Sequence, residues 1–396
     1  MKVCIFGQGF VATILQIGVQ RIAQGDLEAY GVPLASELSY PIEAIEFVGS
    51  FDVDADKVGR NVGDIATRYW RGPAISGLDR IPIYSGVHLG ELRGVPITPA
   101  GLDDQATLLE CVEQLLSVYD RIRPDVFVNL CTTERPQAFE SANDFFRAIR
   151  SEERSRLVPS LVYYYSVLQY ARDRPAAFVN CIPTSIANDP IMERLARTHG
   201  VVLFGDDGAS GATPLMADLL EHERERNRLV QSIAQFNIGG NYDFLALTDP
   251  ERNIAKEQTK SATVREILGY DAPHYIKPTG YLEPLGDKKF MAMHLPYVSF
   301  NGAEDEVFVV ARMNDSPSLA GLLVDLVRLG QLCLDAGLSG AVNPVNAFYM
   351  KSPGPAEIQS TSRILAYSKL RRWLAEIQQP PALVEPPPEA QEDPPR

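Results

Sequence analysis

Two asparagines and an aspartate surround a pair of glycines in the stretch FNIGGNYDF, residues 236–244. The two glycines allow a tight turn, because glycine adopts backbone angles that other residues avoid. Such a turn would direct Asn237, Asn241 and Asp243 toward one space. The sequence therefore predicts a polar site at this turn, where Asp243 and the asparagines also offer the oxygen ligands that hard cations prefer.

Lysines concentrate in the same part of the chain. Only nine of the 37 basic residues are lysine, none lies between Lys57 and Lys256, and six fall between Lys256 and Lys351. Lysine, unlike arginine, can lose its proton when buried or crowded, and so can act as an acid or base. Lys256 and Lys260 lie four apart in a helical pattern, so repulsion on one helix face would favour the neutral form of at least one. The alternative is a pair of exposed lysines paired with nearby acids.

Three further stretches add charged groups. LGDKKFM places Lys288 and Lys289 at the start of a strand, so their side chains point to opposite faces and only one can face a site. RMNDSPSLAG puts Asp315 and Ser316 just before a long helix, where helix capping alone could explain them. FYMKSP places Lys351 among apolar and small residues, where an ammonium group needs a reason to lose its water.

A phosphate site is predicted where GDDGASGATPLMADLLEHE leaves a strand and enters a helix at Pro214. Thr213 is the predicted N-cap, and proline is favoured at the first helical position. Backbone amides of this turn would face outward at the positive end of the helix, an arrangement that binds anions. An ordinary capped helix explains the sequence about equally well. The predicted cradle comprises Ser210, Gly211, Ala212 and Thr213.

The elements that position these groups begin with KVCIFGQGFVATILQIGVQRIA, an apolar strand that runs through a G-x-G-x-x-A turn into a helical pattern. This context predicts dinucleotide binding, because the glycines let backbone amides approach a pyrophosphate at the helix N-terminus. A second strand, IEAIEFVGSFDVD, ends in the acid expected to hold the adenosine ribose, later than the usual spacing of about 20 residues. The predicted cofactor contacts are Gly7, Gly9, Phe10, Val11 and Asp52.

Three buried strands follow in the patterns DVFVNLCT, AAFVNCIP and VVLFGDD, with helical patterns such as TLLECVEQLLSVYDRI between them. The sequence therefore predicts an α/β fold with a Rossmann-like, doubly wound parallel sheet. Ligands of such sheets bind beyond the carboxyl ends of the strands. The residues predicted to line that cleft are Thr132, Thr133, Asn180, Pro183, Asp206 and Asp207.

From about Asn237 to Asn346 the rhythm changes to strand-like FMAMHLPYVSF and EVFVVARM and helical SPSLAGLLVDLVRLGQLCLDAG. This predicts a smaller α+β domain, residues 237–346, inserted into the larger one. The cofactor domain would span residues 1–236 and be completed by residues 347–379. The proline-rich, acidic residues 380–396 are predicted to be a disordered tail.

Composition argues against several classes of function. The net charge of −14 disfavours a nucleic-acid surface, which needs a basic patch. Glycines interrupt the first apolar run before it could serve as a signal peptide or membrane span, so we expect a cytoplasmic protein without a membrane contact. The five cysteines form no C-x-x-C, and the absence of H-E-x-x-H, G-x-S-x-G and Walker motifs disfavours metalloproteases, serine hydrolases and P-loop enzymes.

Together these stretches resemble the myo-inositol-1-phosphate synthases, and more closely their archaeal and bacterial branch. The resemblance runs in order, with matching spacing, through FVGSFDVDADKVG, CTTERP, FVNCIPTSIANDP, FGDDGASGATP, NIGGNYDF, KEQTKSATV, GDKKFMA, NDSPSLAG and FYMKSP. It implies a redox-neutral, NAD-dependent conversion of D-glucose 6-phosphate to 1L-myo-inositol 1-phosphate, by oxidation at C5, enolisation, closure onto C1 and reduction at C5. It also implies a homotetramer, and leaves open whether a divalent or monovalent cation assists.

The resemblance assigns roles to the lysines, because each oxygen that becomes anionic needs a cation or a proton donor. Lys256 and Lys289 would polarise the C5 oxygen. Lys260 would hold the phosphate with the cradle, and Lys351 would act near the C1 and C5 oxygens. Ser316 would contact the cofactor. The residues that would orient hydroxyls, lysines or a cation are Asp207, Asn237, Asn241, Asp243 and Asp315.

Two departures from the family pattern keep alternatives open. Ala209 stands where members often carry a lysine, and Phe10 stands where they often carry an asparagine. One alternative is a relative that acts on another sugar phosphate, and a second is an NAD-dependent dehydrogenase with net turnover of cofactor. A third is a non-catalytic NAD-binding regulator, which has no need for four matched lysines.

Overall fold

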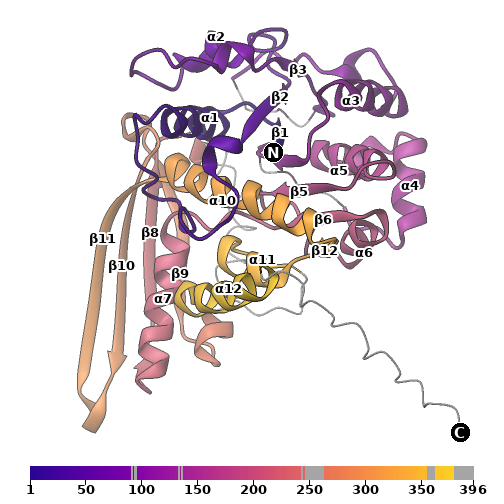
Figure 1. Cartoon of the computed structure of the whole chain (residues 1–396). Helices are drawn as coiled ribbons and strands as arrows, with labels where there is room; N and C mark the ends of the chain where they lie inside the picture. The colour runs from indigo at the N-terminus through magenta and orange to yellow at the C-terminus, as the bar shows by residue number, and fades with distance from the viewer. Residues whose placement is uncertain are drawn as a thin grey trace, which may run out of the picture.

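The large layer of the computed structural model is a parallel sheet (Figure 1). The structure describes residues 1–90, 92, 96–132, 134, 137–241, 244–245, 263–354 and 362–378. The strands of this sheet are β1 (Lys2–Phe6), β2 (Glu46–Asp52), β3 (Ile83–Ser85), β4 (Val126–Asn129), β5 (Ala176–Asn180), β6 (Val201–Phe204) and β12 (Gly340–Ala341).

Within the described residues these seven strands run in the order β12-β6-β5-β4-β1-β2-β3, and every neighbouring pair is parallel. The strand order reverses between β1 and β4, which is the switch point where doubly wound sheets bind ligands. The predicted α/β fold class is confirmed, and the carboxyl ends of these strands are the place to look for a site.

Helices cover both faces of the large sheet. Side chains alternate along each strand, so the apolar residues of one strand are shared between the two faces. Val3 and Ile5 of β1 join one hydrophobic cluster, and Cys4 and Phe6 join the other. The first face carries α1 (Phe10–Ala23), α2 (Val62–Ala66), α10 (Asp315–Asp335), α11 (Asn343–Tyr349) and α12 (Arg363–Ile377). The second face carries α3 (Leu108–Ile122), α4 (Ala142–Arg150), α5 (Pro159–Tyr170) and α6 (Pro190–His199).

Helix α10 is a core helix of the large layer. Among the described helices it is the one with the length and composition of a membrane span, yet 61% of its apolar stretch is buried inside the protein. It packs against α1 and β5. The helix falls within the segment that the sequence assigned to the inserted domain, but its apolar residues complete the core beneath the large sheet.

A second, mixed sheet stands beside the large one, at the left of Figure 1. Its strands are β7 (Leu229–Val230), β8 (Ile233–Gly239), β9 (His274–Tyr281), β10 (Lys288–Val298) and β11 (Glu304–Asn314). Strands β8 and β9 are parallel, whereas β10 and β11 form a long antiparallel hairpin. The predicted helix around Lys256 and the predicted tail of residues 380–396 lie outside the described residues.

One face of this small sheet is covered by a helix, and the other face carries exposed side chains. Helix α7 (Ala212–Glu225) packs over one face, where Met216 and Leu220 meet Met291 and Met293 in a hydrophobic cluster. Alternate residues of β11 are exposed on the sheet, among them Phe308 at 66% and Val310 at 70%. The covered face holds the small sheet against α7, so the first residues of α7 and β10 are fixed relative to each other.

Candidate active site

The segments 205–209 and 349–354, far apart in sequence, meet at the carboxyl end of β6. Gly208 forms a bridge with Met350, and the Lys351 amide donates to the Asp207 carbonyl at 2.6 Å. These backbone contacts bring the side chains of the two segments close together. It explains how the motif FYMKSP, near the end of the chain, reaches the sheet edge that holds GDDGAS.

Lys351 and Asp207 form the first of two lysine–aspartate pairs. The Lys351 Nζ donates to Asp207 Oδ1 at 3.0 Å, and the side chains are 20% and 14% exposed. A charge-assisted hydrogen bond in such a partly desolvated place is stronger than its counterpart at the surface. The pair therefore holds an ammonium group at the strand ends. Asp207 also supplies the reason why Lys351 can lie among apolar residues with little water around it.

Lys289 and Asp315 form the second pair, with Nζ and Oδ2 3.6 Å apart. The two β10 lysines diverge as predicted, since Lys288 is exposed while Lys289 is partly buried. Asp315 Oδ1 is buried and has no hydrogen-bond partner in the described part of the chain. A buried carboxylate oxygen without a donor is costly, so this oxygen is a natural acceptor for a ligand hydroxyl.

The start of α7 lies against the second pair. Gly211 has a φ of +75°, and a Cβ added to it would lie 2.7 Å from Asp315 Oδ1 and 3.1 Å from Lys289 Nζ. The positive φ favours glycine at this position, and the two short distances show how near the end of each side chain lies to the turn. This contact brings Ser210 and the first residues of α7 beside the lysine, so the predicted anion cradle and a cation share one location.

The predicted cap of this helix was wrong. Helix α7 begins at Ala212 with Gly211 as its N-cap, and no side chain in the described part of the chain caps it. The positive φ of Gly211 lets the chain enter the helix two residues earlier than expected. Thr213, 7% exposed, and Pro214 therefore lie inside the first turn. A helix N-terminus without a side-chain cap or an acidic residue in its first turn suits an anion.

The turn after β8 is only partly as expected. Asn237 is 1% exposed; its Nδ2 donates to Lys277 O at 3.0 Å and its Oδ1 accepts from Gln235 at 3.1 Å. Its side chain therefore ties β8 to β9 and does not join the predicted polar space. Asn241 does face the site motifs, because its Nδ2 donates to Asp287 Oδ1 at 3.3 Å.

Asp287 is a residue that the sequence interpretation missed. Its Oδ1 accepts from the Ser316 hydroxyl at 2.6 Å, and its Oδ2 accepts from the Ser316 amide at 3.0 Å. Burial raises the pKa of Asp287, and the donors from Ser316 and Asn241 oppose that rise. Asp315 and Ser316 do not precede the helix as predicted, since α10 starts at Asp315. The capping alternative fails too, because Asn314 is the N-cap and its side chain makes no capping bond.

The glycine loop after β1 lies at the switch point of the large sheet. Gly7 has a φ of +91°, and a Cβ there would be 2.6 Å from the Leu130 carbonyl that follows β4. Among the residues that the structure describes, a Cβ at Gly9, the N-cap of α1, would meet nothing within 4 Å, and no side chain caps this helix. Phe10 and Val11 are half-buried in its first turn. Open space over an uncapped helix end is the arrangement that a pyrophosphate requires.

Asp52 lies beside this loop but is already occupied. It accepts from the Gln8 amide at 2.9 Å, from Lys57 Nζ at 3.1 Å, and from the two backbone amides that follow it. An ionised carboxylate has about four acceptor sites. A ribose hydroxyl would therefore have to share an oxygen that Lys57 now holds, and Lys57 becomes a site residue that the sequence did not single out.

The remaining residues at the strand ends are of two kinds: some are accessible to a ligand, and others are buried and support the loops around them. Thr132 is exposed and Pro183 is half-buried, so both can face a ligand. Asn180 and Asp206 are fully enclosed and bond to each other at 2.7 Å. Their prediction as residues that line the cofactor cleft is corrected to a supporting role, because Asp206 also receives donors from the loop 186–188. Four predicted site residues lie outside the described residues: Thr133, Asp243, Lys256 and Lys260.

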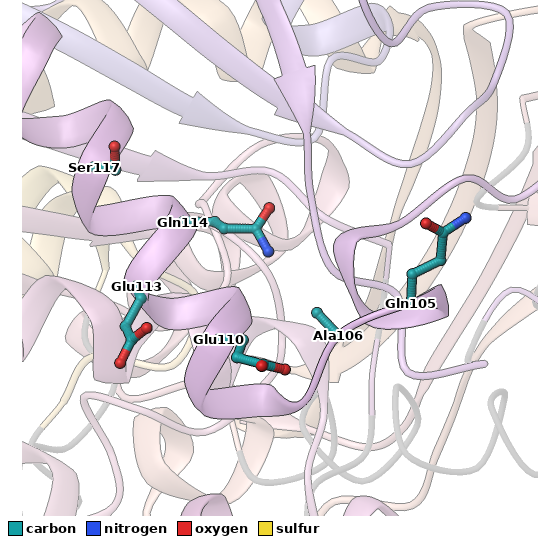
Figure 2. Close-up of a pocket in the computed structure, with 6 residues that line it drawn as sticks. All are labelled: Gln105, Ala106, Glu110, Glu113, Gln114 and Ser117. Atoms are coloured by element: carbon teal, nitrogen blue, oxygen red, sulfur yellow. The ribbon is translucent and has the colours of Figure 1, made fainter.

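A hollow of about 460 Å³ on the surface of α3 is separate from this site (Figure 2). It is lined by Gln105, Ala106, Glu110, Glu113, Gln114 and Ser117. Two of these residues are acidic and none is basic. The hollow therefore lacks the chemistry to hold a phosphate, and the candidate active site remains at the two lysine–aspartate pairs.

Comparisons with known proteins agree with this geometry. Residues 211–316 match the family model for myo-inositol-1-phosphate synthase. The chain is 53% identical to a myo-inositol-1-phosphate synthase-related protein of Thermotoga maritima with a solved crystal structure; the match covers 94% of this chain and 98% of that one, with a TM-score of 0.90. The chain belongs to the myo-inositol-1-phosphate synthase family.

More distant members of the family match as well. The inositol-3-phosphate synthase of Corynebacterium glutamicum is 29% identical over 365 residues, which cover 89% of this chain and 93% of the relative. The crystal structure of inositol-3-phosphate synthase from Caenorhabditis elegans shares the fold at a TM-score of 0.79 and 15% identity, over 95% of this chain and 85% of that one. The family resemblance stated from the sequence is confirmed.

Proposed function

We propose that this family member converts D-glucose 6-phosphate to 1L-myo-inositol 1-phosphate without net oxidation or reduction, with NAD as its cofactor. The observation that carries the proposal is the meeting of three groups: a carboxylate oxygen of Asp315, the ammonium group of Lys289 and the helix N-terminus at Gly211. Within the described residues, that oxygen has no hydrogen-bond partner and that N-terminus has no side-chain cap. These three groups match a hydroxyl, a developing oxyanion and a phosphate of one sugar phosphate.

The residues at the switch point fit a dinucleotide. The open space over Gly9 and the uncapped start of α1 would receive the pyrophosphate. Lys57 and Asp52 would meet the adenosine ribose, and Thr132 and Pro183 would line the cleft. When bound, NAD would accept the hydride from C5 of the sugar and return it to the same carbon, so that the reaction consumes no cofactor.

The two pairs would divide the proton and charge transfers between them. Lys289 would stabilise negative charge on the C5 oxygen, with Asp315 holding a neighbouring hydroxyl. Lys351 would protonate or stabilise the C1 oxygen as the new carbon–carbon bond forms from C6 to C1, and Asp207 would hold its ammonium group in place. Lys256 is proposed to assist at C5, Lys260 at the phosphate and Asp243 at the substrate or a cation.

A homotetramer is also proposed. The supporting observation is the outward face of the small sheet, where Phe236, Phe308 and Val310 are 45%, 66% and 70% exposed. Apolar side chains gathered on one sheet face usually mark a contact surface. Light scattering coupled to size exclusion tests this proposal: a mass near four chains is expected, and a Phe308→Glu variant should lower it.

The test of the reaction is incubation of the purified protein with glucose 6-phosphate and a catalytic amount of NAD. Phosphorus NMR should show a new phosphomonoester identified as inositol phosphate, while absorbance shows no build-up of NADH. Rapid conversion of the added NAD to NADH, followed by arrest until more NAD is supplied, would instead identify a dehydrogenase with net turnover of cofactor.

A second candidate substrate class is another sugar phosphate, and Ala209 is the observation that favours it. Ala209 is 8% exposed at the start of the phosphate loop, so it contributes a methyl group there and no charge. The same assay with other hexose and heptose phosphates separates the two candidates. If one of these compounds is converted and glucose 6-phosphate is not, the proposed substrate is wrong but the proposed type of reaction stands.

A further inference from the structure

Asp287 is a carboxylate with contacts to two motifs that approach from different directions. Its Oδ1 accepts from the Ser316 hydroxyl at 2.6 Å and from Asn241 Nδ2 at 3.3 Å, and its Oδ2 accepts from the Ser316 amide at 3.0 Å. Ser316 belongs to the first turn of α10, and Asn241 to the turn after β8. One side chain therefore bridges the large layer and the small sheet.

The backbone around Asp287 reinforces this bridge. The Gly240 amide donates to the Gly286 carbonyl at 3.0 Å, and the Leu282 amide donates to the Gly239 carbonyl at 2.9 Å. A Cβ at Gly240 would lie 2.5 Å from the Gly286 amide, so only glycine permits the two loops to touch. The loop that carries Asp287 is thus packed backbone to backbone on the glycine turn.

A second connection links the same two elements. Lys289 lies two residues after Asp287 and pairs with Asp315, and Ser316 follows Asp315 directly. Strand β10 and helix α10 are consequently tied twice at their first residues, once by Asp287 with Ser316 and once by Lys289 with Asp315. Because a carboxylate that accepts amide hydrogen at a helix N-terminus also interacts favourably with the helix dipole, the Asp287 tie is the stronger anchor.

We propose that Asp287 is a positioning residue: it fixes the start of α10 and the Asn241 turn relative to β10, and so holds Lys289 and Asp315 in the geometry that the reaction needs. This inference rests on the proposed function for its consequence in catalysis. Asp287 itself touches neither substrate nor reacting atoms in this scheme.

The test compares Asp287→Asn with Glu283→Gln, an exposed acid on the same loop. Asp287→Asn keeps the shape and puts an amide where an acceptor is needed. Its kcat should fall about 10²-fold, the usual scale for misplaced reacting groups, while KM for the sugar phosphate and Kd for NAD stay within about threefold. Glu283→Gln should match the wild type. Ser316→Ala should reproduce the loss in part, and Ser316→Thr, which keeps the hydroxyl, should restore it.

Hydrogen exchange of the full-length protein provides a measurement independent of activity. Asp287→Asn and Ser316→Ala should speed exchange in peptides that cover residues 237–241 and 315–320, and leave peptides from the rest of the large sheet unchanged. If the wild type does not turn over glucose 6-phosphate, the proposed function fails while this arm still tests the bridge. Unchanged exchange in both variants, or a kcat within twofold of the wild type, would overturn the inference.

Discussion

Two aspartates of helix α10 each pair with a basic side chain, and the two pairs differ in how far they are exposed to solvent. Asp315, its first residue, pairs with Lys289 at 3.6 Å, and these side chains are 22% and 14% exposed. Asp325, ten residues later, pairs with Arg328 at 3.0 Å, and these side chains are 0% and 1% exposed. One pair lies at the site and the other lies in the core.

Hydrogen-bond capacity distinguishes the two pairs further. Asp325 also accepts from the Leu34 amide and the Tyr349 hydroxyl, each at 2.8 Å, and Arg328 donates to backbone carbonyls of the loop 34–40. Asp315 keeps one oxygen without a partner among the described residues. Arginine holds its proton in proteins whereas lysine can release it. The saturated arginine pair therefore stabilises the fold, and we propose that the lysine pair, which has spare hydrogen-bond capacity, takes part in the reaction.

The largest effect is expected when the site lysines lose their charge. Lys289→Met or Lys351→Met should lower kcat by about 10³-fold, because each removes the cation that stabilises developing negative charge. The free energy of unfolding should fall by about 1–2 kcal/mol, because each change leaves a largely buried carboxylate without its cation. Steady-state kinetics and urea unfolding measure the two quantities.

Lys288→Met is the matched control, because Lys288 is the adjacent lysine on the opposite face of β10. It should retain wild-type kcat. Equal losses for Lys288→Met and Lys289→Met would remove the distinction between the site lysine and its neighbour.

Arg328→Met should have the opposite profile. It leaves Asp325 buried without its cation, which typically costs about 3–5 kcal/mol of stability. Urea unfolding should show this loss, and the folded fraction should keep its kcat. Arg371→Met, at an exposed pair with Glu37, should change stability by less than about 1 kcal/mol. A kcat loss in Arg328→Met that exceeds the loss of folded protein would contradict the structural role.

The adjacent aspartates of GDDGAS repeat the contrast on a smaller scale. Asp206→Asn should lose about 2 kcal/mol, because the new amide cannot accept from the loop 186–188. Asp207→Asn should leave stability within about 0.5 kcal/mol and lower kcat about 10²-fold through a misplaced Lys351. Thermal unfolding and kinetics of the two variants should therefore rank them in opposite orders.

The most gradual expected effect is a dependence of stability on pH. Burial raises the pKa of Asp325 from 3.8 to about 6. Between pH 4 and 6 the folded protein would hold a proton that the unfolded chain has released, so this residue's contribution to stability falls as pH rises through that window. The slope contributed is at most about 1.4 kcal/mol per pH unit. Unfolding free energies at pH 4, 5 and 6 should fall more steeply for the wild type than for Asp325→Asn.

Local patterns in the sequence predicted the parts of the site that depend on short-range geometry. Strand alternation separated Lys289 from Lys288, and the strand–glycine–helix pattern placed Gly7 and Gly9 at the switch point. Asp287 and Arg328 were missed because their partners lie far away in the chain, in the turn after β8 and in the loop 34–40. The cap was misplaced at Thr213 because the sequence does not reveal that Gly211 adopts a positive φ, which starts the helix at Ala212.

The central claim is that one site oxidises and then reduces the same carbon of its substrate. The most direct test uses glucose 6-phosphate that carries deuterium at C5, with catalytic NAD in ordinary water, and mass spectrometry of the product and the free cofactor. The account predicts inositol phosphate that retains the deuterium and free cofactor without label. Deuterium in the free cofactor pool, together with accumulating NADH, would contradict it.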